Sequence, residues 1–135
     1  MARNFDIRPP GQDFERFPEL RLVIIEGGIA WLPPFMWRMD RAWEQLRAEV
    51  PHVRRPPSEY VRQHLWLTTQ PMEEPPRRGD FTQLLTHLDM NDQIMFATDY
   101  PHWDFGAPDS AFPVRLPPDL EQKLMAENAR ALYRL

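Results

Sequence analysis

Three short apolar runs, each followed by a polar residue and a turn, set the pattern of this chain. The runs lie at residues 20–25, 65–69 and 94–98. Apolar runs of this length without alternation are typical of strands buried on both faces, as in a parallel sheet. The sequence therefore predicts three such strands. The residues that directly follow them are Glu26, Gln70 and Asp99.

Segments with helical spacing separate and follow these strands. Apolar residues recur every three or four positions at about 34–49, 81–89 and 119–133. Asp80 with Gln83 has the form of a capping box at the start of the second segment, and Ser58 is placed to cap a single helical turn. The aromatic and methionine stripe of the first segment is interpreted as core rather than as a cofactor site.

Prolines mark the boundaries between these elements. Proline makes up 16 of the 135 residues, more than twice the usual fraction of about 5%. Proline ends helices and strands. Residues 1–13 are predicted to form an irregular N-terminal arm, and residues 14–17 the end of a short helix stopped at Pro18. Residues 99–118 form a long loop, and such loops are usually functional or disordered.

The alternation of strand and helix predicts an α/β fold with a parallel sheet. Right-handed crossovers place all three strand ends at one edge, so Glu26, Gln70 and Asp99 are expected to converge there. A carboxylate such as Asp99 at that edge is suited to bind a divalent metal or to carry a proton. The alternative is that Asp99 only caps the turn that follows it.

Composition narrows the class of protein. At 135 residues the chain is long enough for one domain, and its net charge of −4 argues against nucleic acids or anionic membranes as partners. The absence of cysteine excludes disulfides and thiolate chemistry. No apolar run approaches the ~18 residues of a membrane span, and the first residues lack the apolar region of a signal peptide. A cytoplasmic protein is expected.

Four motifs, taken in order, resemble the C-terminal part of the amidohydrolase-related family. This is the amidohydrolase 2 group of the metal-dependent hydrolase superfamily, which also holds aminocarboxymuconate-semialdehyde and resorcylate-type decarboxylases. The resemblance covers about residues 14–135. The motifs are Ile25-Glu26-Gly27-Gly28-Ile29-Ala30-Trp31-Leu32-Pro33, Arg54-Arg55-Pro56-Pro57-Ser58-Glu59-Tyr60, Thr68-Thr69-Gln70-Pro71 and Thr98-Asp99-Tyr100-Pro101-His102-Trp103-Asp104.

The resemblance implies a TIM-type (β/α)₈ barrel with a divalent metal at its C-terminal face. It implies that the three units here are the last three, with strands six to eight. A complete barrel needs about 250 residues, so the chain is expected to be an incomplete barrel, with 14–135 as its C-terminal portion. Three strands alone would leave two open sheet edges. A split-gene product, a truncated fragment or a piece that needs its other half all remain open.

By this resemblance, Asp99 matches a strand-eight aspartate that binds metal and takes a proton from the attacking water. Glu26 falls where several decarboxylase relatives carry a catalytic histidine, so hydrolysis and decarboxylation both remain open. The family's strand-one His-x-His and its strand-five histidine have no counterpart here. A divalent metal (Zn, Mn or Mg) is implied for the complete enzyme. The chain alone is expected not to bind it stoichiometrically.

Three further residues are candidates for the substrate rim: Gln70, His102 and Trp103. His102 could equally be an ordinary turn residue, and a packing role is favoured for Trp103.

Two functions are compatible with these sequence features. The first is the C-terminal portion of a metal-dependent hydrolase or decarboxylase with a small-molecule substrate. The second is a non-catalytic remnant or interaction module, which lacks the metal-binding half and uses its open edges to bind a complementary N-terminal barrel half or a second copy.

Overall fold

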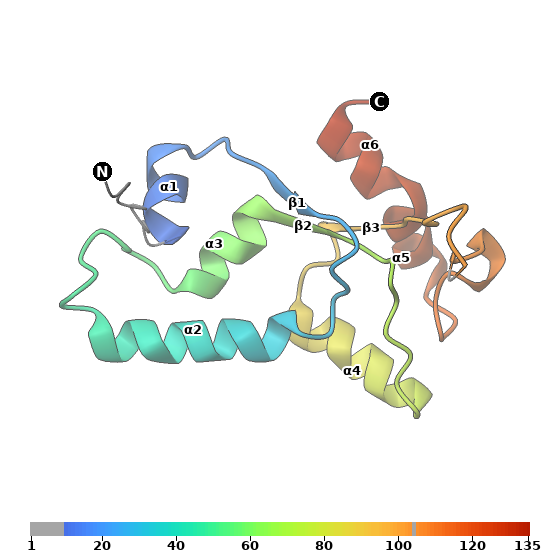
Figure 1. The fold of residues 1–135 in the computed structure, drawn as a ribbon, viewed down its shortest axis with the longest axis horizontal. Coiled ribbons are helices and arrows are strands. Elements are labelled where there is room, and N and C mark those ends of the chain that lie inside the picture. Colours follow the sequence, from blue (N-terminus) through green and yellow to red (C-terminus); the bar gives the residue numbers. More distant parts are fainter. Residues whose placement is uncertain (1–9, 104) are drawn as a thin grey trace, which may run out of the picture.

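The computed structural model describes residues 10–103 and 105–135 (Figure 1). Strands and helices alternate along the chain as the sequence predicts, and each strand is shorter than its apolar run. None of the described helices is both long and apolar enough to cross a membrane. The elements are α1 (Pro10–Arg16), β1 (Leu22–Ile24), α2 (Leu32–Leu46), α3 (Pro57–His64), β2 (Leu65–Thr68), α4 (Arg78–Leu88), β3 (Ile94–Met95), the 3₁₀ turn η1 (Pro108–Ser110) and a C-terminal helix made of α5 (Pro118–Gln122), the π-helical segment η2 (Lys123–Glu127) and α6 (Asn128–Tyr133).

The strands form one parallel sheet in the order β1-β2-β3. In its register, Leu67 of β2 pairs with Ile24 of β1 and with Ile94 of β3. Side chains alternate between the faces of a sheet, so these three share one face. They pack into a core with buried residues of α2 and α4, which lie together on one side of the strands in Figure 1. The predicted α/β class with parallel strands is confirmed.

β1 is only half-buried, which corrects the prediction that it is covered on both faces. Leu22 is half-exposed and Ile25, just after the strand, is 65% exposed, whereas Leu67 of β2 is fully buried. The reason is position, because β1 lies at the edge of the sheet and β2 at its centre. An apolar run has the same composition at the edge and at the centre of a sheet, so the sequence does not distinguish the two positions.

The two sheet edges differ, although both were predicted to be open. Alternate residues of a strand direct their polar backbone groups to opposite sides, and those of Ile94 and Phe96 point away from β2. The Phe96 N–H donates to the Leu124 carbonyl of the C-terminal helix (2.9 Å). The Asn128 amide donates to the Ile94 carbonyl (2.7 Å). The C-terminal helix therefore covers the β3 edge, and the β1 edge is left open in the described part of the chain.

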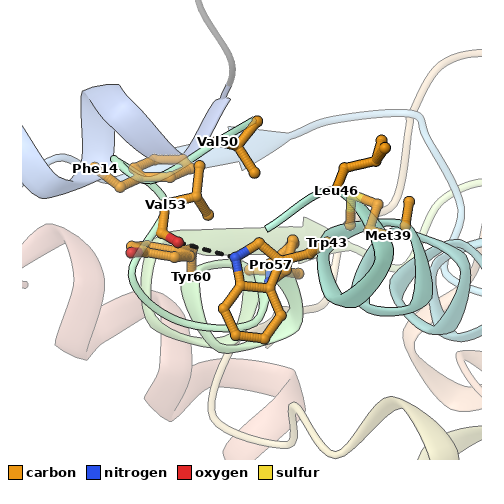
Figure 2. Close-up of a pocket in the computed structure, with 10 residues that line it drawn as sticks. Phe14, Met39, Trp43, Leu46, Val50, Val53, Pro57 and Tyr60 are labelled. Atoms are coloured by element: carbon orange, nitrogen blue, oxygen red, sulfur yellow. Dashed lines mark hydrogen bonds between the residues drawn. The ribbon is translucent and has the colours of Figure 1, made fainter. Parts of the chain in front are cut away.

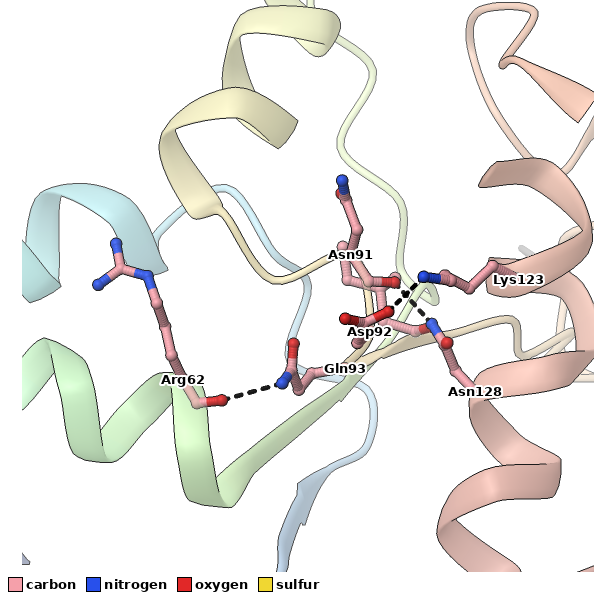
Figure 3. Close-up of polar contacts among 7 residues, drawn as sticks. Arg62, Asn91, Asp92, Gln93, Lys123 and Asn128 are labelled. Atoms are coloured by element: carbon pink, nitrogen blue, oxygen red, sulfur yellow. Dashed lines mark hydrogen bonds and ion pairs between the residues drawn. The ribbon is translucent and has the colours of Figure 1, made fainter. Parts of the chain in front are cut away.

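Polar contacts fasten this helix to the loop before β3 (Figure 3). The Asn128 amide also donates to the Asn91 carbonyl (2.7 Å), and Lys123 pairs with Asp92 (2.5 Å). The hydrogen bond and the charge of Asp92 raise the pKa of the Lys123 ammonium above its ordinary value. Asn128 is the buried member of this group, at 5% exposure.

Replacing Asn128 by alanine is expected to lower the free energy of unfolding by about 2–3 kcal/mol, because the buried Ile94 carbonyl and the part-buried Asn91 carbonyl would lose their donor. Chemical denaturation followed by circular dichroism measures the change. Arg130→Ala, on the exposed side of the same helix, is the control and should stay within about 0.5 kcal/mol of the wild type. Equal losses in the two variants would contradict the role of Asn128.

Two predicted helix caps are wrong. α4 begins before Asp80, whose carboxylate accepts a hydrogen bond from the Arg77 side chain (3.0 Å) and does not cap the helix. α3 has eight residues rather than one turn capped by Ser58. The Ser58 N–H instead donates to the Asp40 carboxylate of α2 (2.9 Å). A carboxylate on another helix cannot be found from a local pattern.

The N-terminal region becomes helical earlier than predicted. Residues 10–13 of the expected irregular arm belong to α1, and residues 1–9 lie outside the described part of the chain. Glu15 fastens α1 to the fold, because its carboxylate accepts a hydrogen bond from the Tyr60 hydroxyl and lies 3.9 Å from the Arg54 guanidinium.

The aromatic and methionine stripe of α2 is only partly core. Met36 is fully buried, but Leu46 is half-exposed. The second half of the stripe lines an apolar cavity of about 270 Å³ between α1, α2 and α3 (Figure 2). At its wall the Trp43 indole N–H donates to the Val53 carbonyl (2.9 Å), so this polar group is already paired within the chain.

Candidate functional site

The turn after β1 places Glu26 at the C-terminal end of the sheet. Glu26 has a left-handed backbone conformation (φ 57°), as does Gly28 (φ 63°). The Glu26 N–H donates to the Thr68 hydroxyl at the end of β2 (3.3 Å). The turn is thereby tied to the neighbouring strand, and the Glu26 side chain is left exposed.

The turn after β3 brings His102 onto Asp99. The His102 N–H donates to the Asp99 carbonyl (2.9 Å), and the ring Nδ1 lies 2.9 Å from Asp99 Oδ2. The Asp99 side chain is 16% exposed and that of His102 62%. The Asp99 carboxylate therefore contacts an imidazole, which goes beyond the turn-capping role that the sequence left open.

Glu26, Asp99 and His102 form one cluster at this edge of the sheet. One ligand atom from each lies within 4.8 Å of the others. The expected convergence of Glu26 and Asp99, from the first and third strand, is confirmed as geometry. His102 was expected at a substrate rim or as a turn residue, and the structure places it beside both carboxylates.

The donor set of this cluster fits a divalent cation. Two carboxylates with one imidazole suit several divalent metals, and neighbouring ligands at about 2.1 Å from one ion lie about 3 Å apart. The 2.9 Å between Asp99 and His102 matches this separation. The spread of up to 4.8 Å among the three ligand atoms is wider than this, and the Glu26 side chain is exposed.

The backbone supports a functional interpretation of both carboxylates. Four described residues other than glycine have a positive φ, and two of them, Asp89 and Arg134, are ordinary left-handed helix C-caps. Glu26 and Asp99 have no such role, since each follows a strand. Left-handed residues other than glycine cost about 1–3 kcal/mol and cluster at functional sites.

One carboxylate that the sequence analysis missed holds the Glu26 turn. Both oxygens of Glu73, in the loop after β2, accept a hydrogen bond from the Ile29 N–H (3.0 Å), and Oε1 also accepts one from the Ala30 N–H (2.9 Å). The same carboxylate lies where a side chain on Gly28 would project. In the sequence Glu73 is one charged residue in a proline-rich loop, and no local signal distinguishes it.

Gln70 and Trp103 are the other predicted site residues. Gln70 is buried and borders a second cavity of about 330 Å³ between the loops after β2 and β3, with Phe96 and Phe105 on its walls. Trp103 is 94% exposed, so the packing role favoured for it is not found among the described residues. The substrate-binding roles of Gln70, His102 and Trp103 stay predictions.

Comparisons with known proteins identify the family of this chain and structures with a similar fold. A family model described as amidohydrolase matches residues 12–135. A 5-carboxyvanillate decarboxylase from Sphingomonas paucimobilis is 24% identical with a TM-score of 0.67, and the alignment covers 93% of this chain. A putative amidohydrolase from Staphylococcus aureus is 26% identical with a TM-score of 0.64, over 90% of this chain. No curated protein matches the chain.

A third similar structure contains a metal. It is a dihydroxybenzoic acid decarboxylase from Polaromonas sp. JS666 with bound manganese and the inhibitor 2-nitroresorcinol, 23% identical with a TM-score of 0.66 over 93% of this chain. This chain covers 37% of each of the three structures, little more than a third of their length. The three-stranded sheet therefore fits a part of a larger α/β fold.

Proposed function

Because this chain belongs to the amidohydrolase family, we propose that it is the C-terminal portion of a metal-dependent hydrolase or decarboxylase that acts on a small organic substrate. The cluster of Glu26, Asp99 and His102 carries this proposal. It puts two carboxylates and an imidazole at the C-terminal ends of parallel strands, where α/β enzymes collect their catalytic groups.

In this proposal β1, β2 and β3 are strands six to eight of a (β/α)₈ barrel, and residues 14–135 are its C-terminal portion. The parallel order of consecutive strands supports this assignment, as does the short span of the similar structures that the chain covers. A complementary N-terminal barrel half is the partner that such a portion requires.

Asp99, with Glu26 and His102, would hold a divalent metal (Zn, Mn or Mg), and the manganese in similar decarboxylase structures supports a divalent metal. The cation would polarise the substrate or lower the pKa of a bound water. The His102 ring lies 2.9 Å from the Asp99 carboxylate, so the two side chains are close enough to share one cation. Asp99 accepts a proton, Glu26 serves as acid, base or orienting group, and Gln70 and Trp103 border the substrate.

Titration with Mn²⁺ tests the site directly. The chain is expected to bind one Mn²⁺ weakly, seen as a loss of the electron paramagnetic resonance signal of aqueous Mn²⁺. Asp99→Asn should abolish this binding, because a neutral amide is a poorer ligand than a carboxylate. Asp109→Asn, in the exposed turn η1 of the same loop, should leave it unchanged. Equal binding by the two variants would contradict the assignment of Asp99.

A non-catalytic interaction module is the second candidate. The open β1 edge and the exposed side chains of Glu26 and His102 favour it, because an exposed edge strand invites pairing with another chain. The same titration separates the two functions, since an interaction module predicts no binding of Mn²⁺ by the wild-type chain.

A further inference from the structure

We propose that Glu73 is a positioning residue that fixes the loop carrying Glu26 and so sets the distance between the Glu26 and Asp99 side chains. This inference rests on the proposed function, because it takes Glu26 and Asp99 as parts of one site. Glu73 acts through the backbone after Glu26 and is not itself a ligand.

The contact between the Glu73 carboxylate and the loop depends on the charge of the carboxylate and on the conformation of the loop backbone. Successive backbone N–H groups around a left-handed residue form a small anion-binding concavity, and here the N–H groups of Ile29 and Ala30 both donate to Glu73. Gly28 supplies the left-handed backbone (φ 63°) and, having no side chain, the room for the carboxylate. Hydrogen bonds to an ionised acceptor are about twice as strong as neutral ones.

The loop is held at two points, and Glu26 lies next to one of them. Thr68 accepts a hydrogen bond from the Glu26 N–H (3.3 Å), and Glu73 holds the N–H groups of Ile29 and Ala30. Both anchors come from β2 or from the loop that follows it. Between them stand two glycines, which have the greatest backbone freedom of any residue.

A third contact in the loop does not replace Glu73. The Trp31 indole N–H donates to the Gly27 carbonyl (2.8 Å), but Trp31 belongs to the same segment and moves with it. Without Glu73, the Glu26 turn would keep its hydrogen bond to Thr68 and the packing of buried Ile29, but the N–H groups of Ile29 and Ala30 would lose their acceptor. The left-handed conformation of Glu26 would then lack the surroundings that enforce it.

Amide hydrogen exchange tests the contact itself. In Glu73→Gln one oxygen is replaced by an NH₂ donor that faces the Ile29 N–H, so exchange at Ile29 and Ala30 should become about tenfold faster. Glu74→Gln is the matched control, because Glu74 is the adjacent, exposed carboxylate, and it should leave both rates unchanged. Glu73→Asp keeps the charge and should restore part of the protection, which also serves if Glu73→Gln fails to fold.

A thiol cross-linking measurement tests the positioning role. The chain has no cysteine, so the double variant Glu26→Cys/Asp99→Cys carries the only two thiols. A short bifunctional reagent that fluoresces once it joins two thiols reports their separation. Adding Glu73→Gln should slow the cross-linking step about fivefold or more, as loss of one such anchor permits. Adding Glu74→Gln should not, and Glu73→Asp should recover part of the rate.

The two measurements decide different points. Unchanged exchange at Ile29 and Ala30 would overturn the contact. Faster exchange with unchanged cross-linking would show that Glu73 only stabilises the loop, and would overturn the positioning role. Both measurements are made without metal, so failure of the wild-type chain to bind Mn²⁺ would count against the proposed function and leave this test intact.

Discussion

The 135-residue chain by itself is expected to purify without stoichiometric zinc and to show no metal-dependent hydrolysis or decarboxylation. Two of its three candidate ligands, Glu26 and His102, are exposed to water. Electrostatic stabilisation of a transition state depends on a preorganised site that excludes water. Among the described residues, the loops around the cluster leave the Glu26 and His102 side chains exposed.

Metal analysis of the purified chain and absorbance assays with hydroxybenzoate substrates and added Mn²⁺ check this expectation. Decarboxylation would change the aromatic absorbance of the substrate. Turnover by the chain that disappears in Asp99→Asn and persists in Asp109→Asn would show that the site is already complete, and would overturn the incomplete-barrel proposal.

Self-association is the second large effect that we expect. β1 lies at the edge of the sheet with its outer side unpaired in the described part of the chain. Leu20, Leu22 and Ile25 are exposed along it. An apolar, unprotected edge strand is a template for pairing with another chain. The β3 edge offers no such template, because the C-terminal helix occupies it.

Sedimentation velocity at several concentrations measures this association. The wild-type chain should shift from monomer toward larger species as its concentration rises. Leu22→Lys should move the distribution back toward monomer, because a charged side chain on an edge strand opposes pairing. Trp37→Lys, at a similarly exposed apolar position on α2, is the control and should have little effect. A wild-type monomer at all concentrations, with one sharp thermal transition, would contradict this prediction.

The sequence alone determined the number, order and type of the main elements and the family. The three apolar runs, the helical spacing between them and the proline boundaries are local signals, and each predicted strand formed. The convergence of Glu26 and Asp99 also followed from the sequence. Parallel strands joined by right-handed crossovers bring their C-terminal ends to one edge whatever the details of packing.

Only the tertiary structure decided which side chains complete and hold the site. Glu73 reaches the N–H groups of Ile29 and Ala30 across more than forty positions of sequence, and Asp40 takes the role predicted for Ser58 as a cap. The exposure of β1 and the covering of β3 likewise depend on neighbours that are remote in sequence. The sequence shows which hydrogen-bond donors and acceptors each residue has, and the fold determines which partner lies within hydrogen-bonding distance.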